Sequence, residues 1–225
     1  MADDTIRPTA AIADPAPLGL AGFALTTFVL SAHNAGWAPD LAWLGPALFY
    51  GGLAQLLAGM WEFRNRNTFG STAFTTYGAF WLSLAAFVVL DLFGKVPASV
   101  NVAHALGWFV LAFAIFNTYM LLWSAAVNRA VFGVFLTLEI TEILLFIGFF
   151  AGQSAGEGLV MIGGWVGVLT ALVAWYASAA GVVNAMAQRP VVPVGAPLWD
   201  LSGGSARPGS PFPRVEATSG PSRTG

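Results

Sequence analysis

The chain enters its first apolar stretch through the motif Asp14-Pro15-Ala16-Pro17-Leu18-Gly19-Leu20. Six apolar stretches follow one another from this motif to Met186. Each has room for the roughly 20 apolar residues that a helix needs to cross a bilayer. They predict helices at residues 17–36, 41–63, 71–93, 102–126, 130–152 and 159–187. The runs are continuous and too long for strands, which argues against a membrane barrel. The sequence therefore predicts an all-α integral membrane protein with six transmembrane helices.

The amino-acid composition also indicates a chain that lies in lipid. Of the 225 residues, 57% are hydrophobic and 9% are charged, whereas soluble domains carry about 25% charged residues. The formal net charge is -2 and no basic run is present, so no nucleic-acid partner is expected. The absence of cysteine excludes disulfides and thiolate-ligated metals.

The positive residues fall on one side of the six predicted spans. This side carries Arg7, Arg64, Arg66, Arg129, Arg189, Arg207, Arg214 and Arg223, whereas Lys95 stands on the other. Positive loops stay in the cytoplasm, so both termini are expected there. Residues 1–13 then form a cytoplasmic N-terminal segment and residues 14–187 the six-helix domain. Residues 188–225 are rich in Pro, Gly and Ser and are expected to form a disordered cytoplasmic tail, in which Trp199 and Leu201 can touch the membrane surface.

The entry motif has the chemistry of an anion site. Pro15 and Pro17 suit the first turn of a helix, where a backbone N–H would lack an intrahelical partner. The remaining N–H groups and the positive end of the helix dipole attract carboxylates. A half-buried start at Pro17, Leu18 and Gly19 can therefore hold a small carboxylate. The alternative is that the two prolines merely begin the helix.

Several motifs together resemble one known family. They are the entry motif, His33-Asn34, Phe49-Tyr50-Gly51-Gly52-Leu53-Ala54-Gln55, Asn67-Thr68-Phe69-Gly70 and Ala73-Phe74-Thr75-Thr76-Tyr77-Gly78-Ala79-Phe80-Trp81. On these motifs the chain resembles the acetate uptake transporter (succinate–acetate permease) family. The resemblance covers residues 14–187 and is strongest through the first three helices. Asp14 departs from the family pattern, which has Asn at this position.

The resemblance implies both architecture and function. Members are six-helix proteins that assemble as homo-hexamers, with one pore in each protomer. They pass acetate and related small carboxylates, succinate among them, by proton-coupled or channel-like transport. The resemblance thus implies a multi-pass protein of the inner cell membrane that is not an enzyme and needs no cofactor or metal. The alternative is a structural or receptor-like membrane protein that transports nothing, although the acidic and polar residues within the spans weigh against it.

The resemblance also implies candidate site residues. The family's constriction maps to Phe23, Tyr77 and Leu138. Counted from the predicted helix starts, these residues lie at depths of about 9, 9 and 12 Å, which is compatible with one ring. The candidate substrate-binding residues are Pro17, Leu18, Gly19, Asn34, Gln55, Thr76 and Tyr77.

Two acids in the fifth predicted span, Glu139 and Glu142, are not part of the family pattern. An ionised carboxylate at mid-bilayer costs at least ~2.5 kcal/mol and usually faces the protein interior. Glu142 lies four residues after Leu138 and shares its helix face, so it is expected to border the pore just outside the constriction. A protonated Glu142 can hand a proton to the substrate, which makes it a candidate for proton coupling. The alternative is that both acids only pair with polar groups of neighbouring helices, and this interpretation is favoured for Glu139.

Overall fold

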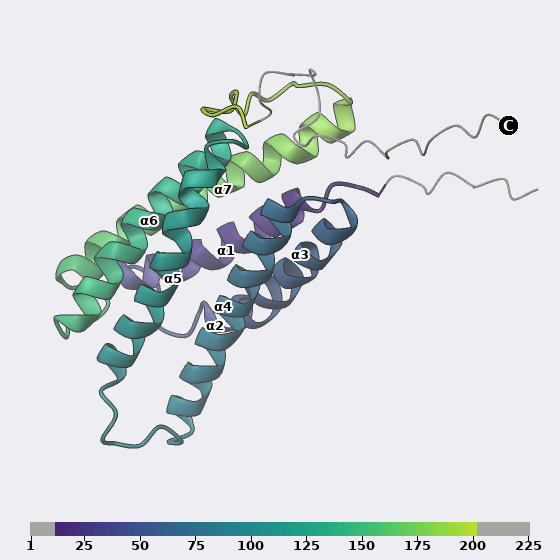
Figure 1. Cartoon of the computed structure of the whole chain (residues 1–225). Coiled ribbons are helices and arrows are strands. Elements are labelled where there is room, and N and C mark those ends of the chain that lie inside the picture. The colour runs from purple at the N-terminus through teal and green to yellow at the C-terminus, as the bar shows by residue number, and fades with distance from the viewer. Residues whose placement is uncertain (1–11, 202–225) are drawn as a thin grey trace, which may run out of the picture.

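The computed structural model describes residues 12–201, which form a bundle of long helices (Figure 1). Five helices are long and apolar enough to cross a membrane: α1 (Ala16–Asn34), α4 (Thr68–Leu92), α5 (Val102–Ser124), α6 (Arg129–Phe150) and α7 (Gly158–Ala187). Their ends lie within three residues of the predicted ones. Asparagine side chains explain three of the starts, because Asn67, Asn101 and Asn128 each accept a hydrogen bond from the backbone N–H three residues further on.

The segment predicted as one helix at 41–63 is divided into three pieces. These are α2 (Leu44–Leu48), the π-helical turn η1 (Phe49–Ala54) and α3 (Gln55–Arg64). The wider turn has a partner on α1, because the Gly51 N–H donates to Thr26 Oγ1 at 3.0 Å. A side chain at Gly51 would place its Cβ 2.5 Å from the same oxygen, so only glycine allows this approach. A side-chain hydroxyl inserted between turns is a known cause of such a break.

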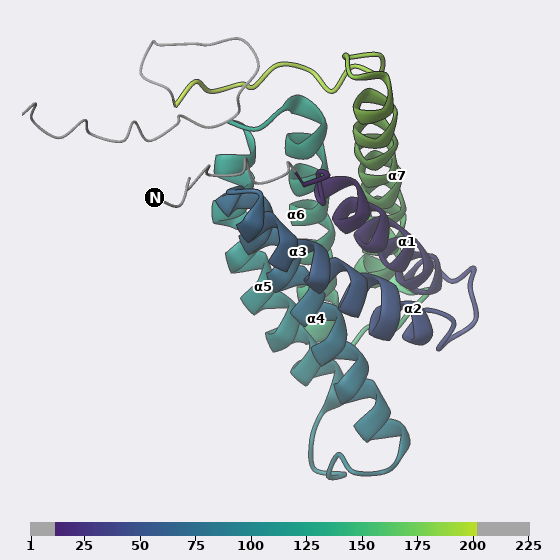
Figure 2. The same ribbon diagram turned by 90° about the vertical axis from the view of Figure 1, so that its right-hand side faces the viewer.

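The turns sort to the two ends of the bundle in the pattern that the charges predict. The start of α1, the α3–α4 turn, the α5–α6 turn and the end of α7 lie at one end, and the α4–α5 loop lies at the other (Figures 1 and 2). The first end, here called the arginine end, carries Arg64, Arg66, Arg129 and Arg189. Lys95 belongs to the α4–α5 loop at the opposite end.

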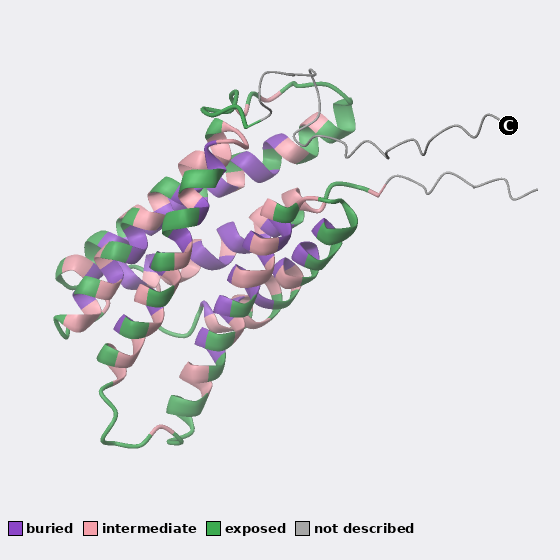
Figure 3. Cartoon of the chain, viewed as in Figure 1, coloured by how far each residue is buried: buried purple, intermediate pink, exposed green. Residues whose placement is uncertain are grey.

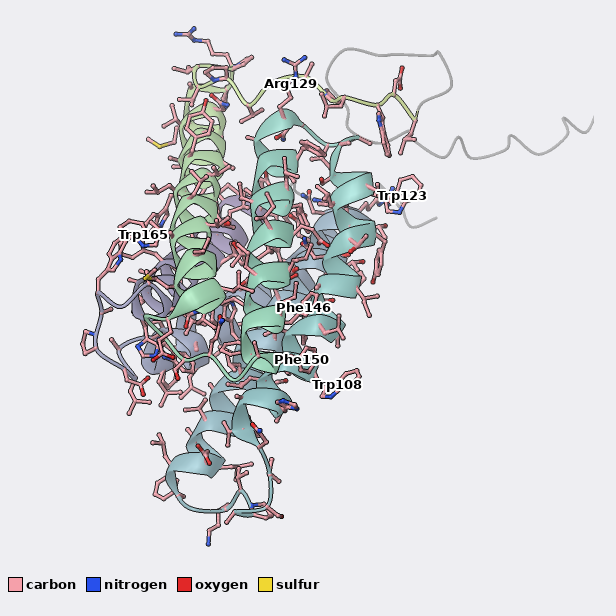
Figure 4. All side chains as sticks on the ribbon, turned by 90° about the vertical axis from the view of Figure 1, so that its left-hand side faces the viewer. Trp108, Trp123, Arg129, Phe146, Phe150 and Trp165 are labelled. Atoms are coloured by element: carbon pink, nitrogen blue, oxygen red, sulfur yellow. The ribbon has the colours of Figure 1, made fainter. Side chains whose placement is uncertain are left out.

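The outer faces of the helices are apolar. Figure 3 shows buried positions on the faces turned toward neighbouring helices and exposed positions on the outside. Trp108, Trp123 and Trp165 project outward from the bundle (Figure 4), and their side chains are half-exposed or more. Inside, small residues bring helices together, as where Gly164 and Gly167 of α7 pack on α1 at Ser31 and Ala35. Five apolar spans with apolar outer faces are the architecture of a multi-pass membrane protein.

Residues 190–199, called here the strap, follow the surface at the arginine end (Figure 1). Asn184 of α7 bonds the backbone of Val191 and Val192, and the Tyr176 hydroxyl donates to the Pro193 carbonyl. Val194 O accepts from Ala130 N at 2.9 Å, and Leu198 N donates to Ala125 O at 2.7 Å. Trp199 packs against Trp123 of α5 rather than reaching away from the bundle. The composition of residues 188–201 alone gives no hint of these contacts, and residues 202–225 of the predicted tail lie outside the described residues.

Candidate functional site

A cavity of about 80 Å³ opens between α1, α3, α4 and α6 toward the arginine end. Its walls are almost entirely apolar, and three of its lining residues, Gln55, Asn67 and Tyr77, are polar. Each helix contributes one face. The spacing of four and three residues places Ala16, Leu20 and Phe23 of α1 in one line, as it does for Val131, Val134 and Leu138 of α6.

The three residues of the predicted constriction meet at this cavity. Phe23, Tyr77 and Leu138 all line it, and all three are buried. The rings of Phe23 and Tyr77 pack edge to face with centroids 5.7 Å apart. They come from α1, α4 and α6, so the bundle brings together side chains that are far apart in the sequence. Their role in narrowing a pore stays a prediction.

The entry motif contributes to the cavity through different residues than expected. Pro17 faces α7, where Ser178 Oγ donates to its carbonyl at 2.7 Å, and Leu18 is 48% exposed. Gly19 faces the ring of Phe74. Among the described residues, the cavity lining includes Ala16 and Leu20, on either side of this segment, but not Pro17, Leu18 or Gly19.

The backbone donors at the start of α1 are also largely engaged. The Ala16 N–H donates to Asp14 Oδ1 at 3.0 Å, and the Gly19 N–H donates to Pro15 O at 3.2 Å. Pro17 has no N–H. The Leu18 N–H therefore remains as the donor of this first turn that has no partner among the described residues. Asp14, the residue before the N-cap Pro15, therefore engages the first amide of the helix through its side chain. Carboxylate binding by Pro17, Leu18 and Gly19 stays a prediction.

The other candidate substrate-binding residues differ in whether they line the cavity. Gln55 lines the cavity, is 1% exposed, and its Oε1 has no hydrogen-bond partner among the described residues. Thr76 is half-buried beside Tyr77 but lies outside the cavity lining. Asn34 is buried at the far end of α1, where its carbonyl accepts from Gly156 N at 2.9 Å. It lies 18 residues after Ala16, or about 27 Å along the helix. Gln55 and Tyr77 are thus the members of this set that the cavity brings together.

Tyr77 also belongs to a buried polar cluster behind the cavity. Its hydroxyl lies 2.9 Å from Asn117 Oδ1 of α5 and 3.4 Å from Glu142 Oε1 of α6. The Asn117 amide donates to Glu139 Oε2 at 2.7 Å and to the Phe135 carbonyl at 3.0 Å. Glu142 is 4% exposed and does not line the cavity directly, but contacts it through Tyr77. The central position of Asn117 could not be predicted, because the sequence shows only a polar residue within an apolar span.

A second buried acid, Glu62 at the end of α3, was not among the predicted site residues. It is fully buried, and its Oε2 accepts a hydrogen bond from Asn65 Nδ2 at 3.1 Å. Its Oε1 lies close to Gly70, which lines the cavity. The signal for it was an acid between Trp61 and Phe63 at the end of an apolar run.

A second cavity of about 240 Å³ lies between α4 and α5 on the side of Tyr77 away from the arginine end. It is lined by Ser83, Leu84, Phe87, Ala105, Leu106 and Phe109. Three rings separate it from Tyr77. Phe80 stacks on Phe109 at 5.1 Å, Phe113 contacts both, and Phe80 in turn contacts Tyr77 at 6.2 Å between ring centroids.

Comparison with known proteins places this arrangement in a family. Residues 4–196 match the model of the GPR1/FUN34/yaaH family. The chain is 39% identical to the succinate-acetate/proton symporter SatP of Escherichia coli K12 over 82% of this chain and 96% of that protein. It is 38% identical to acetate permease A of Emericella nidulans over 87% of this chain and 70% of that protein. It is 43% identical to accumulation of dyads protein 2 of Saccharomyces cerevisiae, of whose length it spans 64%.

The same relationship holds for the fold. The structure of the bacterial acetate channel SatP matches with a TM-score of 0.77 at 39% identity, covering 82% of this chain and all of that chain. The architecture of the helices thus occurs in a solved relative. The match to the family model and the extent of these similarities show that the chain belongs to the GPR1/FUN34/yaaH family.

Proposed function

We propose that this protein passes acetate and related small carboxylates, succinate among them, across the cell membrane through the cavity within each protomer. The observation that carries the proposal is the meeting of Phe23, Tyr77 and Leu138, from three separate helices, at one cavity. The relatives with the matching fold include a protein named as an acetate channel and one named as a succinate-acetate/proton symporter. The protein is therefore proposed to be a transporter rather than an enzyme.

The chemistry of the cavity suits a small acid. Apolar walls accommodate a methyl group, and the amide of Gln55, whose Oε1 has no partner among the described residues, can hydrogen-bond a carboxyl group. None of the described residues that line the cavity is charged. An anion without a charged partner pays a desolvation cost of several kcal/mol in such a site. The neutral acid is consequently the form expected to pass the constriction, which ties the movement of a proton to that of the substrate.

The proposed membrane arrangement has six spans. The broken segment from α2 through η1 to α3 is the second span, because it connects the two ends of the bundle between α1 and α4. The arginine end and both termini are placed in the cytoplasm by the positive-inside rule. Residues 1–13 and 188–225 are then cytoplasmic segments flanking the transporter domain 14–187. The location in the inner cell membrane and the assembly as a homo-hexamer follow from the family resemblance.

Glu142 is proposed as the site of proton coupling. It is buried in the middle of α6, contacts the cavity through Tyr77, and its Oε2 has no partner among the described residues. Glu139 has a different position, since both of its oxygens lie within hydrogen-bond distance of donors, Asn117 Nδ2 and the Thr118 hydroxyl. Glu139 is therefore assigned a structural role.

Uptake of radiolabelled acetate into proteoliposomes tests the proposal. Protein-free liposomes measure the acid that crosses the lipid itself, and this rate is subtracted. Saturable uptake that unlabelled acetate and succinate inhibit is the expected result. Uptake that does not exceed that of protein-free liposomes, from protein that remains folded, would favour the structural or receptor-like alternative.

A second measurement separates the two transport modes. A channel for the anion gives an electrical current under an acetate gradient at constant pH. A proton symporter moves acid without net charge and acidifies the lumen of the vesicle as substrate enters. Replacing Glu142 with Gln is expected to change the dependence of uptake on pH between 5 and 8. An unchanged profile would make Glu142 structural.

A further inference from the structure

The buried cluster around Tyr77 forms a directed chain of hydrogen bonds across three helices. Tyr77 comes from α4, Asn117 from α5, and Glu139 and Glu142 from α6. Tyr77, Asn117 and Glu142 are each at most 4% exposed, so the cluster is shielded from bulk solvent. The direction of each hydrogen bond therefore depends on the donors and acceptors within the cluster.

The orientation of the Asn117 amide follows from its neighbours. One end of the amide lies 2.7 Å from Glu139 Oε2 and 3.0 Å from the Phe135 carbonyl, both of which are acceptors. That end must be the NH₂ group, because an amide oxygen there would face two other oxygens. The amide oxygen then points to the Tyr77 hydroxyl at 2.9 Å and accepts its proton.

This assignment determines what Glu142 can do. The Tyr77 hydroxyl has one proton, which is directed to Asn117. The contact of 3.4 Å between Tyr77 Oη and Glu142 Oε1 is then a favourable one only when Glu142 carries a proton and the phenol oxygen accepts it. The second oxygen of Glu142 is buried without a partner, which is costly for a carboxylate and much less so for a neutral acid.

We infer that the Tyr77 hydroxyl relays a proton between Glu142 and a carboxylate in the cavity, so that Tyr77 is both a wall of the constriction and the proton donor of the transport cycle. This inference rests on the proposed transport of small carboxylates. Tyr77 is suited to the role because it alone among the four cluster residues also lines the cavity. Asn117, held by Glu139, is a positioning residue that accepts the Tyr77 proton between transfers and so leaves the phenol oxygen free to accept from Glu142.

The relay balances in protons and charge. When a carboxylate occupies the cavity, the Tyr77 hydroxyl turns about its C–O bond from Asn117 toward the substrate. The Tyr77 O–H bond then breaks as its proton passes to an oxygen of the substrate carboxylate, and the Glu142 O–H bond breaks as its proton passes to the phenol oxygen. The substrate is then a neutral acid, Tyr77 is unchanged, and Glu142 is a carboxylate. A proton that enters the cavity from solution restores Glu142 by the reverse transfer through the same hydroxyl. One proton thus moves with each carboxylate.

The titratable groups around the relay are few among the described residues. Tyr77 of α4 and Glu139 of α6 are the titratable neighbours of Glu142, and Tyr119 of α5 is a further titratable neighbour of Tyr77. The neighbouring residue Thr141 contacts Thr170 of α7 through their uncharged hydroxyls at 3.3 Å. Tyr119 is 45% exposed, and no hydrogen bond among the described residues links it to the cluster, so it provides a matched control.

The test compares the initial rate of acetate uptake between pH 6 and 8 in Tyr77→Phe, Glu142→Gln and the control Tyr119→Phe. Without the relay, uptake depends on acid that is already protonated in solution, whose concentration falls about tenfold for each pH unit. Tyr77→Phe and Glu142→Gln are therefore expected to lose about 100-fold in rate over this range. The parent and Tyr119→Phe are expected to lose less than tenfold, because Glu142 supplies the proton.

Each other outcome has a definite meaning. A parent that takes up no acetate contradicts the proposed function, and the relay falls with it. If the parent is active and either relay variant keeps its shallow pH profile, the relay is wrong while transport stands. Loss of uptake by folded Tyr77→Phe at every pH would show that the hydroxyl binds substrate instead of passing a proton, which also overturns the relay.

An infrared measurement tests the protonated Glu142 without transport. The parent should show the C=O stretching band of a buried carboxylic acid, which Glu142→Gln removes. Tyr77→Phe should shift this band, since the acid loses its hydrogen-bond partner, and Tyr119→Phe should leave it in place. A parent without a band that depends on Glu142 contains an ionised Glu142, and the relay is then wrong.

Discussion

Replacing Gly19 with Ala tests how tightly α1 is packed beside the cavity. A Cβ at this position would lie 2.7 Å from Cγ and Cδ1 of Phe74 and 2.8 Å from Cδ2. Carbon atoms in contact are normally about 3.5–4.0 Å apart, so the ring must move by roughly 0.8 Å or more. Phe74 is buried and lines the cavity, which is the space that its ring can enter. The substitution is therefore expected to narrow the cavity rather than to leave it unchanged.

The magnitude follows from the cost of overpacking. Inserting a methyl group into a packed interior costs typically about 1–3 kcal/mol. If the ring relieves this strain by entering the cavity, the substrate must displace it, and the cost appears as an apparent affinity about 5- to 150-fold weaker. The concentration of acetate that gives half-maximal uptake measures this effect. A thermal unfolding curve of the same variant shows how much of the strain instead lowers the stability of the folded protein.

Two further variants make the test specific to Phe74. Gly133→Ala is the matched control, because a Cβ at Gly133 meets its nearest neighbour, Val173, at an ordinary 3.4 Å. It is expected to keep the parent's uptake. Adding Phe74→Leu to Gly19→Ala removes the rigid ring and should restore much of the affinity. If Gly19→Ala takes up acetate with the parent's affinity and is as stable, the contact with Phe74 does not limit the cavity and the reasoning is refuted.

Three other predictions concern separate parts of the molecule. Leu138→Ala should lower the free energy of unfolding by about 2–5 kcal/mol and admit larger carboxylates. Competition of lactate and succinate with labelled acetate measures the substrate range. An unchanged range in folded protein would exclude Leu138 from the constriction. Asn184→Ala removes three hydrogen bonds to the strap and should speed hydrogen exchange of the Val191 and Val192 amides. The control Asn65→Ala, at the end of α3, should leave these amides unaffected. Unchanged exchange in Asn184→Ala would show that other contacts hold the strap. Gly51→Ala places a Cβ 2.5 Å from Thr26 Oγ1 and should cost about 1–3 kcal/mol in unfolding free energy, whereas Gly45→Ala, which meets no atom within 4 Å, should not; equal stability of the two variants would contradict the tight contact at η1.

The positions of the long helices could be predicted from the sequence because they depend on a local property. A run of about 20 apolar residues is sufficient to make a span, and the asparagines and prolines at its ends set the start. The grouping of the arginines at one end could be predicted as well, because successive spans alternate in direction and place alternate turns at the same end. Phe23 and Tyr77 could also be proposed from the sequence, because the short strings of residues around them resemble the family's motifs.

The faces of those helices were decided only by the tertiary structure. A membrane helix is apolar all round, so no hydrophobic stripe in the sequence tells which side meets a neighbour. This is why Gly19 was expected at a substrate site and lies against Phe74, while Ala16 and Leu20 line the cavity. The break of the second segment has the same origin, since it depends on Thr26 of another helix.

The buried polar groups show the same division. That Asn117, Glu139 and Glu142 must find partners was determined by the sequence, because a polar side chain within an apolar span cannot remain unpaired without cost. The sequence did not determine which partner each residue finds. Tyr77 is 40 positions from Asn117 and 65 from Glu142, and it meets them only when α4, α5 and α6 have packed together. The hydrogen-bond directions on which the relay depends therefore belong to the tertiary structure alone.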